Sequence, residues 1–186
     1  MSYKAGIVAL FFLSGTGCTM KSKPVAEVST VSIAEGRLSF TPSSMTAAHN
    51  TWRSQVSVPP LRWSDKLARS AQKWADRLAG NNCTLQHSIS REYGENLYHA
   101  GPVTLSDGSA AVRKIAAQDV VDFWGSEITH YDYASNSCHG VCGHYTQVVW
   151  KSTTEVGCGA AFCGNKGQIW VCRYTPAGNM AGQRPY

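Results

Sequence analysis

The chain has 186 residues, of which 43% are hydrophobic and 10% aromatic, so it is long and apolar enough for one globular domain with a substantial core. Its formal net charge of +5 comes from lysines and arginines that are scattered along the chain rather than gathered in a basic run. This distribution argues against the classes of protein that bind nucleic acid through a basic patch, and we expect no nucleic-acid partner.

Residues 1–17 have the pattern of an export signal. Lys4 gives a basic start, and the apolar run 5–13 is far shorter than the roughly 20 residues that span a bilayer. Small residues then lead to Cys18, and this junction resembles a bacterial lipoprotein cleavage site. We predict a lipoprotein-type signal peptide, a lipid on Cys18, and an exported protein that is extracellular or anchored facing the periplasm or cell exterior. Ordinary secretion with cleavage nearby is the alternative.

A polar segment separates this leader from the domain. Residues 18–40 lack a helical or strand period, which is typical of a flexible tether. We place the domain at residues 41–186. Its first helix is expected to follow a serine cap, to include Met45, and to end before Pro59.

The second helix has the clearest pattern in the chain. Ser64 is a suitable N-cap, and Gly80 marks the end of the helix. Between them, apolar residues repeat at helical spacing: Leu67, Ala71, Trp74 and Leu78. Residues 83–101 are expected to be irregular. A third helix is expected from about Ala110 to Ile128, with an apolar stripe of Ile115, Val120, Phe123, Trp124 and Ile128.

Strands are expected to follow the helices. The stretch Gly143–Trp150 ends in β-branched and aromatic residues and is predicted to be a strand, with His144 on the same face as Thr146. Two further strands, 156–163 and 168–174, are joined by a glycine-bounded turn at 164–167. Helices first and antiparallel strands last, around a shared core, predict an α+β fold.

Six of the seven cysteines lie between Cys83 and Cys172, and the seventh is Cys18. An even set of six in an exported chain predicts three disulfides. Zinc–thiolate sites are the alternative, because the spacings Cys138-x3-Cys142 and Cys158-x4-Cys163 are near those of zinc ligands.

Four short motifs occur in order along the chain: 49–53 (HNTWR), 94–97 (GENL), 143–150 (GHYTQVVW) and 171–179 (VCRYTPAGN). Together they resemble the CAP superfamily of cysteine-rich secretory, antigen 5 and pathogenesis-related class 1 proteins. The resemblance covers residues 41–186 and is nearest to the plant pathogenesis-related class 1 branch. Arg173 departs from the pattern, because the family commonly has Asn there.

The resemblance implies a three-layer α-β-α sandwich with an antiparallel sheet, the CAP or SCP fold, stabilised by disulfides. The implied pairs are Cys83–Cys163, Cys138–Cys142 and Cys158–Cys172. It also implies a central cleft that holds two histidines and two glutamates. Carried over motif by motif, these are His87, Glu95, Glu127 and His144.

Two imidazoles and two carboxylates allow three interpretations. His87 and His144 could hold a metal, with zinc as the candidate, while the carboxylates orient the rings. One glutamate could act as general base in a metal-dependent hydrolase. The four could instead form a satisfied polar network. The sequence shows no Ser-His-Asp or Cys-His arrangement, so we assign no catalytic residue and favour a binding protein over an enzyme. We also expect no required cofactor.

The loop after the third helix carries Ile128, Tyr131 and Tyr133, and the resemblance associates this region with sterol binding. We therefore expect a sterol or fatty-acid type lipid as the ligand of a monomeric protein, with membrane contact only through the lipid anchor. The alternative is that the two tyrosines pack at the edge of the domain.

The last residues, 176–186, resemble a defence peptide that is released from plant members by cleavage between Thr175 and Pro176. The second hypothesis is therefore a virulence or host-interaction factor that mimics the plant proteins and is sensed by a host receptor. The alternative is that this segment packs along the sheet, since proline and glycine suit an irregular terminus.

Overall fold

The computed structural model describes residues 33–34, 37–38, 40–90 and 92–186. The predicted signal peptide, Cys18 and most of the predicted tether lie outside these residues. Within them, no helix is both long enough and apolar enough to cross a membrane. The elements in chain order are β1 (Ile33–Ala34), β2 (Arg37–Leu38), α1 (Pro42–Gln55), β3 (Arg62–Trp63), α2 (Asp65–Gly80), β4 (Gly94–Ala100), β5 (Val103–Thr104), β6 (Ala110–Ala111), α3 (Ala117–Gly125), the 3-10 helix η1 (Ser126–His130), β7 (Tyr131–Asp132), β8 (Ser137–Cys138), α4 (Gly143–Val148), β9 (Glu155–Phe162) and β10 (Gln168–Thr175).

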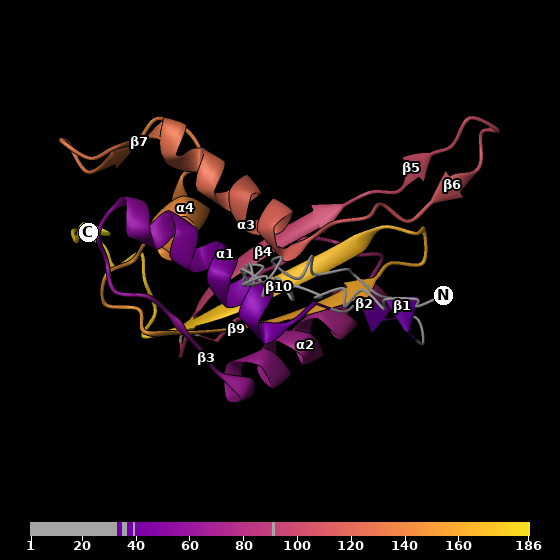
Figure 1. Cartoon of the computed structure of the whole chain (residues 1–186), viewed down its shortest axis with the longest axis horizontal. Coiled ribbons are helices and arrows are strands. Elements are labelled where there is room, and N and C mark those ends of the chain that lie inside the picture. The colour runs from indigo at the N-terminus through magenta and orange to yellow at the C-terminus, as the bar shows by residue number, and fades with distance from the viewer. Residues whose placement is uncertain (1–32, 35–36, 39, 91) are drawn as a thin grey trace, which may run out of the picture.

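A four-stranded sheet forms the middle layer, with the strand order β3-β9-β10-β4. The three long strands are antiparallel to their neighbours, whereas the two-residue β3 runs parallel to β9, so the sheet is mixed. Helix α2 covers one face, and α1, α3 and α4 cover the other (Figure 1). The expected α-β-α sandwich is therefore confirmed.

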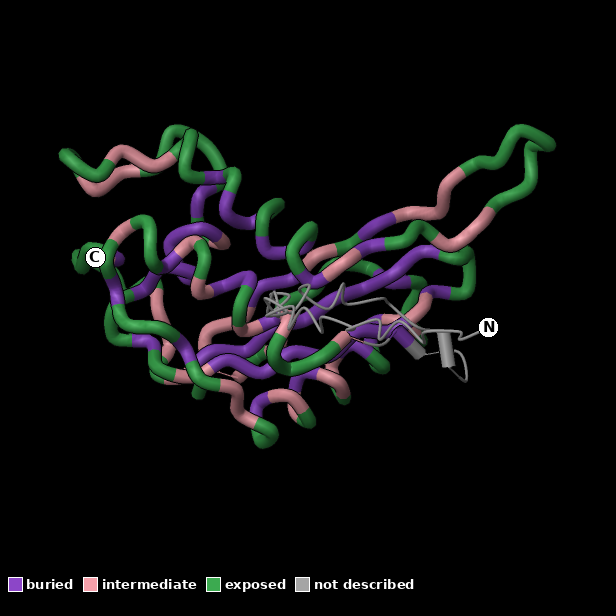
Figure 2. Tube along the Cα trace, viewed as in Figure 1, coloured by how far each residue is buried: buried purple, intermediate pink, exposed green. Residues whose placement is uncertain are grey.

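Alternation along β10 divides the core between the two faces of the sheet. Trp170 and Tyr174 pack with α1, α3 and α4, whereas Ile169 and Val171 pack with the residues of α2. All four side chains are fully buried, and the central strands form the buried middle of the molecule (Figure 2). A strand that is buried on both faces explains why its sequence is almost continuously apolar.

Glycines in β9 let α2 lie unusually close to the sheet. A Cβ atom at Gly159 would be 2.4 Å from the Cα of Gln72, and one at Gly157 would be 2.2 Å from the backbone nitrogen of Ala68. The Gln72 side chain then bonds the backbone of β9, because its Nε2 donates to the Ala160 carbonyl at 2.9 Å and its Oε1 accepts from the Ala160 N–H. This close contact fixes the position of α2 on the sheet.

Three disulfides link the domain: Cys83–Cys163, Cys138–Cys142 and Cys158–Cys172. Cys158 and Cys172 lie directly opposite each other on β9 and β10. The Cys83–Cys163 bond joins the loop after α2 to the end of β9. These are the pairs that the resemblance implies, and they leave none of the six sulfurs as a thiolate for zinc.

The predicted strand at Gly143–Trp150 is wrong. Residues 143–148 form the short helix α4. Contrary to expectation, His144 and Thr146 therefore do not share one face of a strand. Local β-propensity is overridden because both ends of α4 are satisfied by side chains from elsewhere. The Glu127 carboxylate accepts from the first N–H groups, and the Arg53 guanidinium donates to the carbonyls of Val148 and Trp150.

Two further sequence expectations are corrected. Residues 83–101 are not irregular throughout, because 94–100 form the edge strand β4. The third helix is shorter than expected, since residues 110–111 pair with Val103 and Thr104 as β6, and α3 begins only at Ala117. Phe123 and Ile128, assigned to its buried stripe, are 54% and 36% exposed, whereas Ile115, Val120 and Trp124 are buried.

The first two helices are close to their expected positions. The cap of α1 is Thr41 rather than a serine, and its hydroxyl accepts from the Ser44 N–H at 3.0 Å. In α2, Leu67, Ala71 and Leu78 are buried as expected. Trp74, the other residue of this apolar repeat, is only half-buried at the edge of the core.

We expect Gly159→Ala to lower the free energy of unfolding by about 2 kcal/mol, because the added methyl group overlaps the backbone of α2. Gly164→Ala is the matched control, since no atom lies within 4 Å of the Cβ position there. Denaturant unfolding with the disulfides intact measures both. Equal stability of the two variants would contradict the close packing of α2 on β9.

Candidate functional site

A cleft of about 440 Å³ opens on the side of the sheet edge that faces α3 and the N-terminal end of α4. Strand β4 contributes one wall and α3 another, while the loops before β4 and before α4 complete it. The cleft brings together both histidines and one glutamate of the expected tetrad, and most of its other lining residues are apolar. The lining residues are Leu85, His87, Leu97, Tyr98, His99, Phe123, Glu127, Val141 and His144.

Glu127 positions His144. Its Oε1 lies 2.6 Å from the His144 Nδ1, and its Oε2 accepts from the backbone N–H groups of His144 and Tyr145 at 3.0 and 3.3 Å. One carboxylate therefore holds both the ring and the first turn of α4. The Trp124 ring lies nearly parallel to the His144 ring, with the centroids 6.4 Å apart, and further restricts its orientation.

Glu95 positions His87 in the same way but with more partners. Its Oε1 lies 3.0 Å from the His87 Nδ1 and accepts from the Ser88 N–H at 2.9 Å. Its Oε2 accepts from the Ser88 hydroxyl at 2.9 Å and from the Nε and Nη2 of Arg173 at 3.2 and 3.1 Å. Arg173 is only 4% exposed and also bonds the carbonyl and hydroxyl of Ser70 in α2.

These contacts shift the pKa values of both glutamates and of His87. Burial raises the pKa of each glutamate, but hydrogen bonds outweigh it and bring the net pKa of Glu95 and of Glu127 below the ordinary value. Bonds from His87 and Ser88 act on Glu95, and those from His144 and the start of α4 act on Glu127. The hydrogen bond to Glu95 raises the pKa of His87, with burial opposing it.

The residues offer a metal two imidazole nitrogens and little more. Because each Nδ1 faces a glutamate, the Nε2 atoms of His87 and His144 are the ring nitrogens left to meet a ligand. Within the described residues no group of three or more His, Cys, Asp or Glu side chains is arranged to hold a metal. The donor set fits a weak two-histidine site that is completed by other ligands, and it falls short of the three protein ligands usual for catalytic zinc.

Both glutamates use most of their acceptor positions on the protein itself. Five donor atoms surround the two oxygens of Glu95, and this number exceeds the roughly four acceptor positions of a carboxylate. Glu127 is committed to His144 and to the first turn of α4. A base must instead reach the proton of a bound water or substrate.

The apolar rim of the cleft was missed in the sequence. Leu85, Phe123 and Val141 are 54%, 54% and 63% exposed, although large apolar side chains usually find cover. They come from three separate segments, so no single periodic pattern joins them. The available signal was proximity to the tetrad in the chain, since Leu85 lies two residues before His87, Phe123 four before Glu127 and Val141 three before His144.

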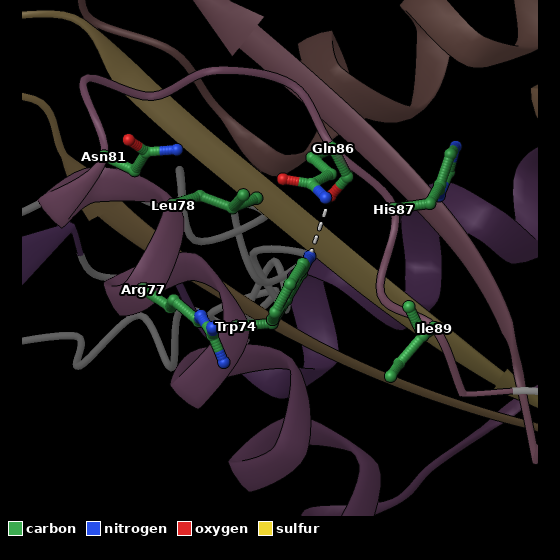
Figure 3. Close-up of a pocket in the computed structure, with 7 residues that line it drawn as sticks. All are labelled: Trp74, Arg77, Leu78, Asn81, Gln86, His87 and Ile89. Carbon is green, nitrogen blue, oxygen red and sulfur yellow. Dashed lines mark hydrogen bonds between the residues drawn. The ribbon is translucent and has the colours of Figure 1, made fainter.

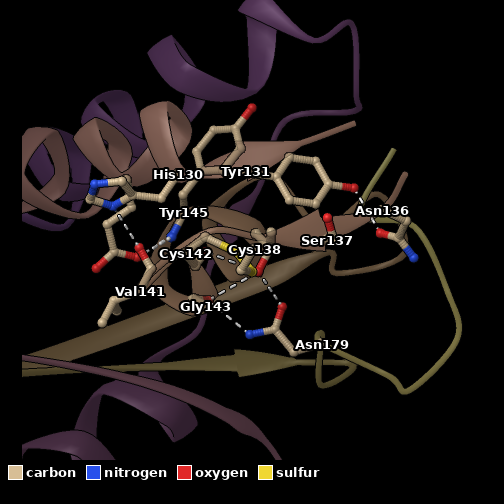
Figure 4. The surroundings of a disulfide bond; sticks show 12 residues. His130, Tyr131, Asn136, Ser137, Cys138, Val141, Cys142, Gly143, Tyr145 and Asn179 are labelled. Atoms are coloured by element: carbon tan, nitrogen blue, oxygen red, sulfur yellow. Dashed lines mark hydrogen bonds between the residues drawn. A yellow bond between two sulfur atoms is a disulfide. The ribbon is translucent and has the colours of Figure 1, made fainter. Parts of the chain in front are cut away.

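The loop that carries Tyr131 and Tyr133 adjoins the Cys138–Cys142 disulfide, and Figure 4 shows Tyr131 and Asn136 on one side of this bond and Val141, which lines the cleft, on the other. The Tyr131 hydroxyl donates to Asn136 at 2.8 Å, and Asn179 reaches back to the Gly143 carbonyl. Tyr131 and Tyr133 both pack against Tyr186 from the last segment of the chain. The expected lipid-binding tyrosines are therefore already in contact with the protein's own tail.

A second cavity, of about 330 Å³, lies between the end of α2 and residues 81–89 (Figure 3). Trp74 forms its floor and donates from Nε1 to the Gln86 carbonyl at 3.0 Å, while Arg77 lies over the indole ring. His87 borders both this cavity and the cleft. The half-buried state of Trp74 follows from its position here.

Comparison with known proteins gives a consistent result. Residues 46–174 match the CAP family model, described as the cysteine-rich secretory protein family. The chain is 43% identical to pathogenesis-related protein 1 of Arabidopsis thaliana over 139 residues, which cover 75% of this chain and 78% of that protein.

Among solved structures, Schistosoma mansoni venom allergen-like protein 4 superimposes with a TM-score of 0.58 at 26% identity, covering 82% of this chain and 94% of that one. NaASP2 with Zn2+ superimposes with a TM-score of 0.60 at 22% identity, covering 82% and 87%.

We expect Glu127→Gln to lower the free energy of unfolding by about 2 kcal/mol at neutral pH, because a charged acceptor for two backbone N–H groups is lost. The folded-state pKa of Glu127 is depressed, so its contribution is present above the ordinary value of 4.5 and is lost as the pH falls through the folded value.

The difference between variant and wild type should therefore shrink below pH 4.5, which denaturant unfolding in a chelator can measure across pH. Glu92→Gln, at an exposed position, is the matched control and should change little. A difference that is the same at all pH values would show that the carboxylate charge is not what holds α4.

Proposed function

The chain belongs to the CAP family of cysteine-rich secretory proteins, and on this premise we propose that it is an exported binding module whose cleft takes up an apolar lipid, either a sterol or a fatty acid. Its three disulfides suit an oxidising compartment outside the cytosol. Lipid anchoring through Cys18 remains part of the proposal.

The observation that carries this proposal is the composition of the cleft. A volume of about 440 Å³ is within the range of small-molecule sites, which are mostly apolar with a few placed polar groups. Leu97, Tyr98 and Phe123 supply apolar walls. The rings of His87 and His144 supply the polar groups, and each is held by its glutamate, so they are preorganised for the hydroxyl or carboxylate of a lipid.

Exposed apolar side chains at the rim support the same ligand class. Leu85, Phe123 and Val141 each expose half or more of their surface around one opening. A ligand with a long apolar body would cover them, which lowers the free energy of the complex by about 25 cal/mol for each Å² removed from water. A small polar ligand would leave them in water.

We assign zinc a secondary role in this cleft. The two Nε2 atoms could share one ion, and the carboxylates would orient the rings as outer ligands do in other sites. Because the protein supplies two ligands, such an ion would be held weakly and would need a further ligand, such as the carboxylate of a fatty acid. The likeness to NaASP2 with Zn2+ is a likeness of fold.

Host interaction is the second candidate function, and 43% identity to a plant pathogenesis-related protein favours it. The packing of the tail argues against ready release of residues 176–186. The Thr153 hydroxyl donates to the Pro176 carbonyl, Gly178 donates to Gln147, and Asn179 bonds Thr146 and Gly143. A host receptor would therefore meet the tail folded on the domain. Hydrolysis ranks last, because both glutamates are committed.

We expect the full chain to bind a fluorescent sterol or a fluorescent fatty acid saturably, and Phe123→Glu to weaken that binding by about 10-fold or more, since burying a carboxylate against a lipid is unfavourable. Leu105→Glu is the matched control. Leu105 is 47% exposed, does not line the cleft, and follows β5 in the hairpin that projects from the rest of the domain (Figure 1). No binding of either probe, or equal losses in both variants, would refute the proposal.

Zinc binding should depend on both histidines. We expect His87→Ala and His144→Ala each to weaken zinc binding by at least about 10-fold in isothermal titration, because one imidazole alone is a poor site. His139→Ala removes an exposed histidine outside the cleft and should leave the affinity unchanged. Equal affinities in all three variants would place any bound zinc elsewhere.

A further inference from the structure

The ring of Tyr186 packs among three other tyrosines, and the space that it fills between them is here called the groove. Its ring stacks on that of Tyr133, with the centroids 4.9 Å apart and the planes 10° apart. The rings of Tyr131 and Tyr145 meet it at steep angles of 67° and 82°, with centroids at 6.3 and 6.5 Å. The Tyr186 ring thus has one offset-stacked partner and two partners at steep angles, and both arrangements are favourable for aromatic rings.

The hydroxyl of Tyr186 is also matched. It lies 3.0 Å from the hydroxyl of Tyr145, whose side chain is fully buried. A buried hydroxyl without a partner is unfavourable, so an occupant of this groove must bring a polar atom to the position that the Tyr186 hydroxyl fills. The groove therefore specifies a planar ring with one hydroxyl group.

Residues 183–186, here called the strap, keep Tyr186 in place through contacts along their length. The Asn136 amide donates to the Gln183 carbonyl at 3.2 Å, and Arg184 donates to the carbonyls of Tyr133 and Ala134. The Lys151 N–H donates to the Pro185 carbonyl at 2.6 Å.

These strap contacts are polar and near the surface, and three of the four strap residues are exposed or partly exposed. Such a segment can open locally while the core stays folded.

Space for the rest of a ligand lies beside the strap. A cavity of about 300 Å³ is bordered by Tyr131, Asn136, Thr146, Trp150, Asn179 and Pro185, among others. It shares no lining residue with the cleft. A ring that replaced Tyr186 could therefore carry a substituent into this cavity without entering the cleft.

We propose that the groove of Tyr131, Tyr133 and Tyr145 is a second binding site, specific for a planar phenol, and that the strap closes it by supplying Tyr186 as a built-in occupant. This site goes beyond the proposed lipid site, because it lies outside the cleft. A sterol fits it less well, since its saturated rings have no π-system to stack on Tyr133 or to make edge-type contacts with the other two tyrosines.

Closure by the strap lowers the apparent affinity of a free phenol. When the competent, open form is a fraction of the population, the apparent dissociation constant rises by the inverse of that fraction. If the open form is a minor state of about one tenth of the population or less, removing the Tyr186 ring raises the apparent affinity for a free phenol by about 10-fold or more.

The test uses the full chain and 2-naphthol, a fluorescent planar phenol, with naphthalene as its counterpart without a hydroxyl and a fluorescent sterol as the third probe. We expect Tyr186→Ala to bind 2-naphthol about 10-fold or more tightly than wild type. It should also prefer 2-naphthol over naphthalene by about 2- to 10-fold, the worth of one hydrogen bond. Adding Tyr133→Ala to Tyr186→Ala should abolish the gain, because the stacking face is lost.

Each other outcome overturns the proposal. No gain for 2-naphthol shows that the strap does not occupy a phenol site, and a gain for the sterol alone shows that the ligand class is wrong. Repeating the titration with Phe123→Glu in the Tyr186→Ala background separates this site from the cleft. If Phe123→Glu removes binding in the cleft but the tighter binding of 2-naphthol is retained, the phenol site is separate from the cleft. This result supports the phenol site even where the lipid proposal fails.

A measurement on the wild-type protein covers the case in which Tyr186→Ala does not fold. If a phenol replaces the strap, saturating 2-naphthol frees the Lys151 amide from the Pro185 carbonyl and speeds its hydrogen exchange. The Cys163 amide, bonded to Gly167 in the β9–β10 turn, is the internal control and should not change. Unchanged or slower exchange at Lys151 overturns the displacement of the strap.

Discussion

The buried guanidinium of Arg53 connects the parts of the molecule that build the cleft. It donates to the carbonyls of Pro59, Val148, Trp150 and Thr153 at 2.7 to 3.0 Å, and its side chain is fully buried. These carbonyls belong to the segment after α1, to the end of α4 and to the chain that leads into β9. One side chain on α1 thus supplies donors to three backbone segments together, as buried carbonyl groups require.

Helix α4 depends on this arrangement because it is too short to be stable alone. Six residues make fewer than two helical turns, and isolated helices of this length do not persist in water. Glu127 satisfies the first N–H groups and Arg53 the last carbonyls, so the helix exists where two distant side chains meet it. The position of His144 in the cleft is therefore set by residues from α1 and η1.

In both His–Glu pairs a carboxylate contacts the Nδ1 of the imidazole, but different groups hold the two carboxylates. Glu127 is held by the start of a helix, whereas Glu95 is held by Ser88 and by the buried Arg173, which stands where the family commonly has Asn. The guanidinium adds a charge-assisted contact and joins the hydrogen bonds from His87 and Ser88 in lowering the pKa of Glu95. Both carboxylates orient an imidazole through its Nδ1.

Much of the fold could be predicted from local sequence. The cap and apolar period of α2, the two apolar runs of β9 and β10 and the turn between them are all legible, because each element satisfies most of its own backbone or pairs with its neighbour in the chain. The family motifs also point to the two His–Glu pairs, which the structure brings together as pairs.

The tertiary structure alone decided three features. Strand β4 contains Gly94, Glu95 and Asn96 and has little local signal, but it pairs with β10, and its open edge is bonded by the Trp124 indole and, through Asn96, by α4. Helix α4 has the composition of a strand. The closure of the tyrosine groove by Tyr186 joins residues far apart in the chain. In each case the deciding hydrogen bond or stacking contact comes from a segment distant in the chain, and a local sequence pattern cannot predict such a contact.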